Sequence, residues 1–216
     1  MLSLRLRLSA ASVTALLGLA APVAAQLRGS VEAFAGYYRP FGKFEPASVY
    51  LTSLPETPSD LSSVAWGAAG RLSIGRRFGV AAQFATTMSQ VPEAITPGGR
   101  FDPVDAAVTM AAVQGQFDLS PRPDAYRVWI GAGPAAVRHG GSAYRPHGSP
   151  TSLGAAVGAT LAVPIASRLQ LVADATTLFY GINIAMPPEA SRNPGPLEHG
   201  RQRDALLRLG LAWGHL

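Results

Sequence analysis

The stretch SVAWGAAGRLSIGRRFGVAAQFATTMS, residues 63–89, decides the fold of this chain of 216 residues. Large apolar residues take alternate positions on both sides of a tight turn at residues 75–79, and small or polar residues stand between them. This period of two, kept over two segments of about ten residues, predicts a β-hairpin. Its small, polar face carries Arg71, and its apolar face carries Trp66 and Leu72. Such a hairpin suits a membrane barrel with lipid outside and a polar lumen inside.

The composition agrees with a membrane barrel and argues against several other classes. Only 14% of the residues are charged, against roughly 25% in soluble domains. The chain contains no cysteine, which excludes a disulfide framework and a thiolate metal site. The chain is rich in arginine, but its charges lie in ones and twos, whereas a nucleic-acid surface needs a clustered basic stripe. We therefore expect no nucleic-acid partner and no cofactor.

The first 25 residues have the pattern of a secretory signal. Two arginines precede an apolar core at residues 10–21, and the small residues 23–25 form a cleavage site. The core is too short for a transmembrane helix of about 20 residues. We expect residues 1–25 to be removed and residues 26–216 to form one outer-membrane β-barrel domain.

Six further segments repeat the alternation of the hairpin. The eight expected strands are approximately residues 31–40, 63–74, 80–89, 106–118, 126–137, 152–163, 169–180 and 204–213. The connections alternate between long and short, and the long ones are residues 41–61, 90–105, 138–150 and 181–202. Long extracellular loops, short periplasmic turns and an even strand number are typical of outer-membrane barrels. The sequence therefore predicts an all-β, eight-stranded antiparallel up-and-down transmembrane β-barrel.

Several local motifs accompany this pattern: Gly36-Tyr37, the hairpin with Gly67, Gly70 and Gly75, the strand Tyr126-Arg-Val-Trp-Ile-Gly-Ala-Gly133, and the closing Leu209-Gly-Leu-Ala-Trp213. With the signal segment, they make the chain resemble the small outer-membrane β-barrel superfamily, the barrels of the outer-membrane protein A and W kind. The resemblance covers essentially the whole mature chain. It implies a monomer in a Gram-negative-type outer membrane, in contact with its lipid. It also implies insertion by the barrel-assembly machinery with periplasmic chaperones.

The resemblance also has limits. The chain ends at Leu216, so we expect no peptidoglycan-binding domain after the barrel. The assembly signal of the family usually ends in an aromatic residue in phase with the lipid face. Here Trp213 is that residue, and three residues follow it.

Five charged residues fall on the predicted inward faces: Glu32, Arg71, Arg127, Asp174 and Arg208. The interior of an eight-stranded barrel is just wide enough for side chains to fill. Because a buried unpaired charge costs several kcal/mol, we expect the two carboxylates to pair with the three arginines, with Arg71 at the centre. A plugged, stabilising network is the favoured interpretation, and a gated or narrow polar path is the alternative.

Four aromatic residues fall on the apolar faces near strand ends: Trp66, Tyr126, Phe179 and Trp213. Aromatic girdles mark both membrane interfaces of outer-membrane barrels. We expect these residues to lie at the interfaces.

Other motifs give weaker signals. Residues 131–136 fit the dinucleotide fingerprint G-x-G-x-x-A, but no helix is expected after them. His147 and Ser149 could be arranged as a hydrolase site with two loop glutamates, but no strand orients them. His139, His147 and His199 lie in two expected loops without metal-ligand spacing. We expect neither an enzyme nor a metal site.

The expected role is that of a structural or surface-exposed membrane protein, with a narrow pore for small or apolar solutes as a variant. The alternative is a binding module whose loops at residues 41–61 and 186–202 contact a host, phage or polysaccharide partner. A lipid-modifying enzyme is the weakest candidate. A soluble periplasmic or lipocalin-like barrel is the rival fold, and it would need apolar residues inside.

Overall fold

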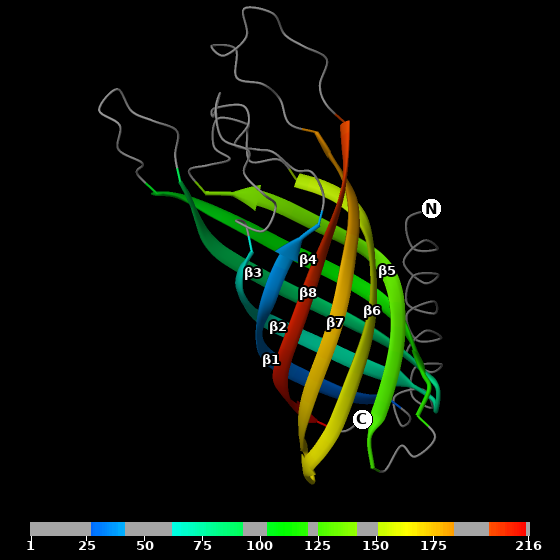
Figure 1. The fold of residues 1–216 in the computed structure, drawn as a ribbon. Helices are drawn as coiled ribbons and strands as arrows, with labels where there is room; N and C mark the ends of the chain where they lie inside the picture. The colour runs from blue at the N-terminus through cyan, green and yellow to red at the C-terminus, as the bar shows by residue number, and fades with distance from the viewer. Residues whose placement is uncertain are drawn as a thin grey trace, which may run out of the picture.

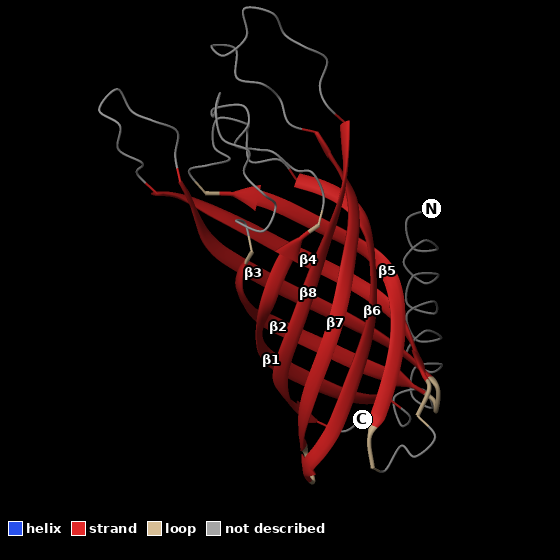
Figure 2. Cartoon of the chain, viewed as in Figure 1, coloured by secondary structure: helices blue, strands red, loops and turns tan. Residues whose placement is uncertain are grey.

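The structure, a computed structural model, is an eight-stranded barrel (Figures 1 and 2). It describes residues 27–41, 62–92, 103–120, 125–141, 151–183 and 199–214. The strands are β1 (Leu27–Pro40), β2 (Ser63–Ile74), β3 (Phe78–Pro92), β4 (Pro103–Asp118), β5 (Arg127–Gly140), β6 (Thr151–Ala166), β7 (Leu169–Asn183) and β8 (His199–Gly214). Neighbours in sequence pair antiparallel, and β1 also pairs with β8, which closes the barrel. The predicted fold class is therefore confirmed.

The hairpin that decided the fold is formed by β2 and β3. Its arms are in register from Ala65, opposite Thr87, to Ile74, opposite Phe78. The turn between them begins at Gly75, whose φ of 66° lies in the left-handed region that favours glycine. The tight connection expected from the sequence is present.

The two faces of the sheet carry different side chains. Trp66 and Leu209 are 56% and 62% exposed on the outside, whereas Arg71 and Gln114 are 4% and 3% exposed in the lumen. An apolar exterior around a partly polar interior is the distribution of a transmembrane barrel. In β4, Met110 and Gln116 share the lumen face with Gln114 and are 2% and 5% exposed. Within the described residues, no helix is long and apolar enough to cross a membrane.

The connections follow the predicted alternation. The short ones are residues 75–77, 119–126 and 167–168, and the strand ends that they join lie at the end of the barrel where β8 ends (Figure 1). The long ones leave the opposite end, which we call the long-loop end. The predicted signal segment, residues 1–25, lies outside the described residues.

Several strands extend further than predicted. β1 begins at Leu27 rather than at residue 31, β5 runs to Gly140, and β8 begins at His199. Glycine and charged or polar residues obscure the alternation at these strand ends, but the backbone ladder continues wherever a partner strand is in reach. Tyr126, expected in the fifth strand, lies in the connection just before it.

Two details distinguish β3, β4 and β5. The β3–β4 pairing continues to Pro92 opposite Pro103, beyond the last partners of these strands in β2 and β5, so a two-stranded ribbon projects at the long-loop end (Figure 1). The β4–β5 ladder is interrupted where Gly133 and Pro134 face β4. Proline has no N–H to donate, and a Cβ on Gly133 would lie 2.0 Å from the carbonyl oxygen of Val113.

Candidate functional site

The centre of the lumen is organised by Arg208 of β8. Its Nε lies 3.1 Å from Oδ1 of Asp174 on β7, and its Nη1 lies 3.5 Å from Oε1 of Glu32 on β1. All three side chains are at most 4% exposed. The arrangement follows from the closure of the barrel, because β8 is the strand between β7 and β1. We call Glu32, Asp174 and Arg208 the ion triad.

Neighbouring residues fix the ion triad in place. The hydroxyls of Thr160 and Thr176 donate to Asp174 over 2.6 and 2.8 Å. The guanidinium of Arg208 lies 4.4 Å from the ring centre of Phe34. Gly210 lies two residues after Arg208 on β8, and a Cβ there would lie 2.6 Å from Oε1 of Glu32 and 2.8 Å from the carbonyl oxygen of Ala33, so a glycine leaves room for this carboxylate. The triad is a packed structural element that occupies the lumen.

Arg71, the predicted centre of the network, lies beside the ion triad instead of within it. Its Nε donates to Oε1 of Gln116 over 2.8 Å, and its guanidinium stacks 4.4 Å from the ring centre of Trp129. Among the described residues, no carboxylate lies at ion-pair distance from Arg71. Arg208 takes the central place because Asp174 is its direct cross-strand neighbour.

Arg127 is also separate from the ion triad. Its Nη1 lies 3.4 Å from Oδ2 of Asp118, and this pair closes the short connection between β4 and β5. Asp118 accepts hydrogen bonds from the backbone and hydroxyl of Ser120, and the hydroxyl oxygen of Ser120 accepts the N–H of Val128. The predicted pairing of Arg127 with Glu32 or Asp174 is therefore wrong. The arginine lies near the turn end of its strand, where Asp118 is the nearer carboxylate.

A second buried cluster surrounds Asp204 nearer the long-loop end. The carboxylate is 0% exposed. It accepts hydrogen bonds from the hydroxyls of Tyr38 and Tyr180 over 2.6 and 2.5 Å and from Nε2 of Gln202 over 2.9 Å. Nε2 of His139 lies 3.3 Å from the hydroxyl of Tyr180. We call these five residues the tyrosine cluster.

Comparison with known proteins places this geometry in a structural class. No protein-family model and no curated protein matches the chain. Among solved structures, the outer membrane protein OprG from Pseudomonas aeruginosa is similar with a TM-score of 0.53 at 11% identity, covering 87% of this chain and 97% of that one. Neisserial surface protein A has a TM-score of 0.50 at 12% identity, covering 86% of this chain and 96% of that one.

The chain has the fold of the small eight-stranded outer-membrane barrels. Three of the four aromatic residues predicted for the membrane interfaces lie on the outside of this barrel. Phe179 is 45% exposed near the long-loop end, on the same half as Trp66, and Trp213 is 58% exposed near the opposite end. Tyr126 is partly buried in the β4–β5 connection.

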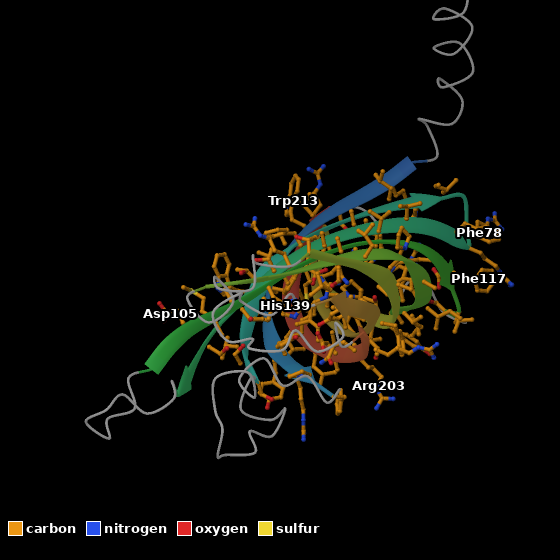
Figure 3. All side chains as sticks on the ribbon, turned by 90° about the horizontal axis from the view of Figure 1, so that it is seen from above. Phe78, Asp105, Phe117, His139, Arg203 and Trp213 are labelled. Atoms are coloured by element: carbon orange, nitrogen blue, oxygen red, sulfur yellow. The ribbon has the colours of Figure 1, made fainter. Side chains whose placement is uncertain are left out.

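The structure also corrects the placement of His139, expected in a loop. It belongs to β5, is 2% exposed and lies inside the ring of strands (Figure 3). Residues 131–136 continue β5 as a strand and open no helix. His147 and Ser149 lie outside the described residues. No group of three His, Cys, Asp or Glu side chains that could hold a metal occurs in the described part of the chain.

Sequence reasoning missed the tyrosine cluster. Tyr38 and Asp204 are in phase with the lumen faces of β1 and β8, so the alternation in the sequence is enough to place both side chains in the lumen. Their proximity depends on how β1 and β8 are staggered when the barrel closes. His139 and Gln202 lie in segments that the sequence predicts as loops, so their inward faces could not be assigned from the alternation.

Proposed function

We propose that this chain is an outer-membrane protein whose barrel is closed by its own side chains. In this proposal it is exported with a cleaved signal at residues 1–25, inserted as a monomer, and acts as a structural or surface-exposed protein. The observation that carries the proposal is the filled lumen.

Three layers of buried side chains support a closed lumen. Toward the long-loop end, Met110, Leu178 and Leu206 are 2%, 1% and 0% exposed and pack in one apolar cluster. The ion triad follows, and a second apolar cluster around Trp129 and Val172 lies beyond it. Side chains this deeply buried support a lumen without a continuous water path between the layers.

Conductance across a planar lipid bilayer tests the closed lumen. We expect the refolded wild type to give no stepwise current, and M110A/L178A/L206A, which removes one lumen layer, to admit small ions. The matched control M88A/L207A/L209A removes the same side-chain types from the outside, where they are 72%, 54% and 62% exposed. Stepwise current through the wild type would overturn the proposal in favour of the narrow pore.

The second candidate is a binding role for the surface at the long-loop end. The β3–β4 ribbon supports it, because its ends at Pro92 and Pro103, which residues 93–102 connect, lie beyond the last partners of these strands in β2 and β5. Replacing these residues by a two-residue turn tests this candidate in cells that display the protein. Equal attachment to host cells and equal phage adsorption for both forms would contradict it.

The proposal assigns no catalytic step to the chain. The check is the lipid A profile of cells that express it. An altered profile that disappears on Ser149→Ala would restore the lipid-modifying enzyme.

A further inference from the structure

Arginine side chains gather on the outside of β1 and β8 at the long-loop end. The guanidinium carbons of Arg39 and Arg203 each lie 5.4 Å from the ring centre of Phe41. The backbone N–H of Phe41 donates to the carbonyl of Arg203 over 2.7 Å, which ties the end of β1 to β8. Arg201 is exposed on the same face of β8, about 7 Å further along the strand. Arg203 points away from the barrel (Figure 3). We call Arg39, Phe41, Arg201 and Arg203 the arginine rim.

The positive charge of the arginine rim is not balanced by the described carboxylates. Four of these, Glu32, Asp118, Asp174 and Asp204, are buried in the barrel. The fifth, Asp105, is exposed on the β3–β4 ribbon, on another part of the barrel (Figure 3). Two guanidinium groups held against one ring repel each other, and an anion bound between them would remove this repulsion. The planar fork of a guanidinium fits phosphate oxygens especially well.

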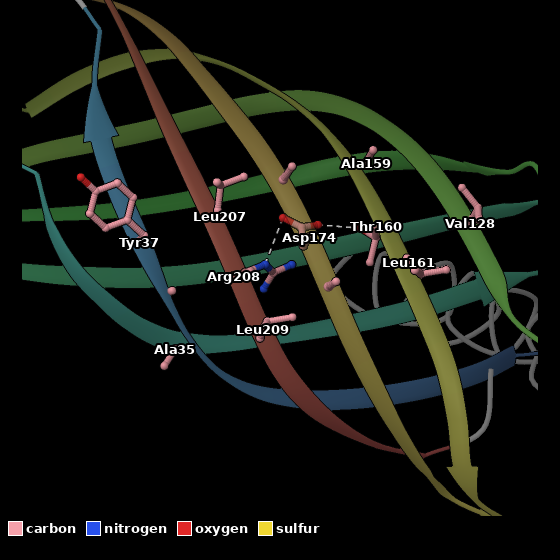
Figure 4. Close-up of a pocket in the computed structure, with 13 residues that line it drawn as sticks. Ala35, Tyr37, Val128, Ala159, Thr160, Leu161, Asp174, Leu207, Arg208 and Leu209 are labelled. Atoms are coloured by element: carbon pink, nitrogen blue, oxygen red, sulfur yellow. Dashed lines mark hydrogen bonds and ion pairs between the residues drawn. The ribbon is translucent and has the colours of Figure 1, made fainter.

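An apolar groove of about 640 Å³ runs across the outer surface of β1, β8, β7 and β6 (Figure 4). Its floor is made by Ala159 of β6 and by Ala173 and Ala175 of β7. Tyr37 and Leu207 stand at its edge, in the same cross-strand row as Ala175 and Ala159. The groove exists because alanines occupy outward positions that bulky residues fill on the neighbouring strands.

The groove and the arginine rim are continuous. Tyr37 lies two residues before Arg39 on β1, and Leu207 lies four residues after Arg203 on β8, all on the outward face. These spacings correspond to about 7 and 13 Å along a strand. The positive charge of the arginine rim matches the phosphate headgroup of a phosphorylated lipid. The apolar groove below the rim, toward the middle of the barrel, matches an acyl chain.

We propose that the arginine rim and the alanine-floored groove form a binding site for a phosphorylated lipid of the outer leaflet. Arg39 and Arg203 take a headgroup phosphate between them, Arg201 adds a third cation, and one acyl chain lies in the groove. The inference rests on the outer-membrane role proposed above and on the orientation predicted from the connection lengths, in which the long-loop end is extracellular.

Native mass spectrometry of the purified barrel in detergent, titrated with lipid A or with dephosphorylated lipid A, tests this site. We expect the wild type to retain lipid A preferentially. We expect R39Q/R203Q to weaken lipid A binding about tenfold, since two charge-assisted contacts to phosphate are lost. The matched control is R76Q/R77Q, which removes the same charge from exposed arginines in the β2–β3 turn at the opposite end.

The groove has its own variant. A159L/A175L fills the floor with side chains that suit a lipid-facing surface, so the barrel should still fold, and heat-modifiable migration on gels checks that it does. We expect its affinity for lipid A to fall about threefold, with the preference for the phosphorylated form intact. Unchanged affinity would overturn the placement of an acyl chain in the groove.

Three other outcomes would overturn the headgroup site. Equal weakening by R39Q/R203Q and R76Q/R77Q would show attraction by bulk charge only. Full competition by inorganic phosphate would show an anion site that does not need a lipid. Weakening by R76Q/R77Q alone would place the phosphorylated lipid at the turn end. That last result would contradict the orientation itself, whereas stepwise current through the wild type would contradict only the closed lumen.

Discussion

The ion triad and the tyrosine cluster bury carboxylates in the same lumen by different means. In the ion triad, Arg208 lies between Glu32 and Asp174 and forms an ion pair with each of them. In the tyrosine cluster, Asp204 is fully buried with two phenolic hydroxyls and one amide as donors and no described cation at ion-pair distance. One site depends on charge balance and the other on the number of donors.

This difference should determine how much stability the barrel loses when single residues of each site are replaced. Removing one partner of a buried ion pair leaves an uncompensated charge and is strongly destabilising, whereas neutral replacement of the whole set is often tolerated. Removing one of several donors to a carboxylate costs a single hydrogen bond. The ion triad should therefore behave as a unit, and the tyrosine cluster should lose stability stepwise.

The largest effect is expected for Arg208→Met, which keeps an unbranched side chain against Phe34 but removes the central cation. We expect the free energy of unfolding to fall by about 3–5 kcal/mol, measured by urea unfolding in lipid vesicles. The matched variant E32Q/D174N/R208M removes all three charges and should recover most of the loss. If the triple variant is as unstable as the single one, charge balance does not govern the site.

An intermediate effect is expected for Tyr180→Phe, which removes one hydroxyl donor from Asp204. The expected loss is roughly 2 kcal/mol, the value of a hydrogen bond to a charged group. Tyr37→Phe is the control, because Tyr37 is 47% exposed on the outside of the barrel. The same unfolding measurement should show almost no change for this control. Equal losses for both variants would contradict the assigned role of Tyr180.

The smallest effect is expected for Arg71→Met. Arg71→Met loses one hydrogen bond to Gln116 and the stacking on Trp129, but it also removes the cost of burying a cation that has no carboxylate at ion-pair distance among the described residues. We therefore expect a net loss of only about 1 kcal/mol. The comparison with Arg208→Met is direct, because both variants delete one lumen arginine. A loss for Arg71→Met as large as that for Arg208→Met would return Arg71 to the centre of the network, as the sequence predicted.

The sequence was sufficient for the fold because lipid and lumen impose opposite demands on alternate residues. Placing Arg71 inward forces Trp66 and Leu72 outward, and this single choice fixes the register of the whole hairpin. The alternation of connection lengths then fixes the order of the strands. The ends of the strands are harder to predict from the sequence. Pro92 and Pro103 are examples, because proline is unfavourable within a sheet and yet occupies the end of the β3–β4 ladder.

Side-chain partners were harder to predict than faces. The alternation of apolar and polar residues predicts that Glu32, Asp174 and Arg208 point inward. Which of these side chains come into contact depends on the stagger of the strands. Arg127 shows a first limit of prediction from the sequence. Its inward face is predicted correctly, but its position along the barrel axis places it beside Asp118. Asp204 shows a second limit of prediction from the sequence. Its partners are neutral hydroxyl and amide groups, so a search for residues of opposite charge does not find them.

Because the β4–β5 ladder is interrupted at Pro134, the barrel wall does not resist strand separation equally at every point. Val113 and Gln114 have no ladder partner in β5 between the pairs made by Ala112 and Gly115. Separating β4 from β5 therefore breaks fewer backbone hydrogen bonds at mid-height than an unbroken seam would require. This stretch is a local weak point between two consecutive strands in the middle of the chain, away from the closure where the first strand meets the last.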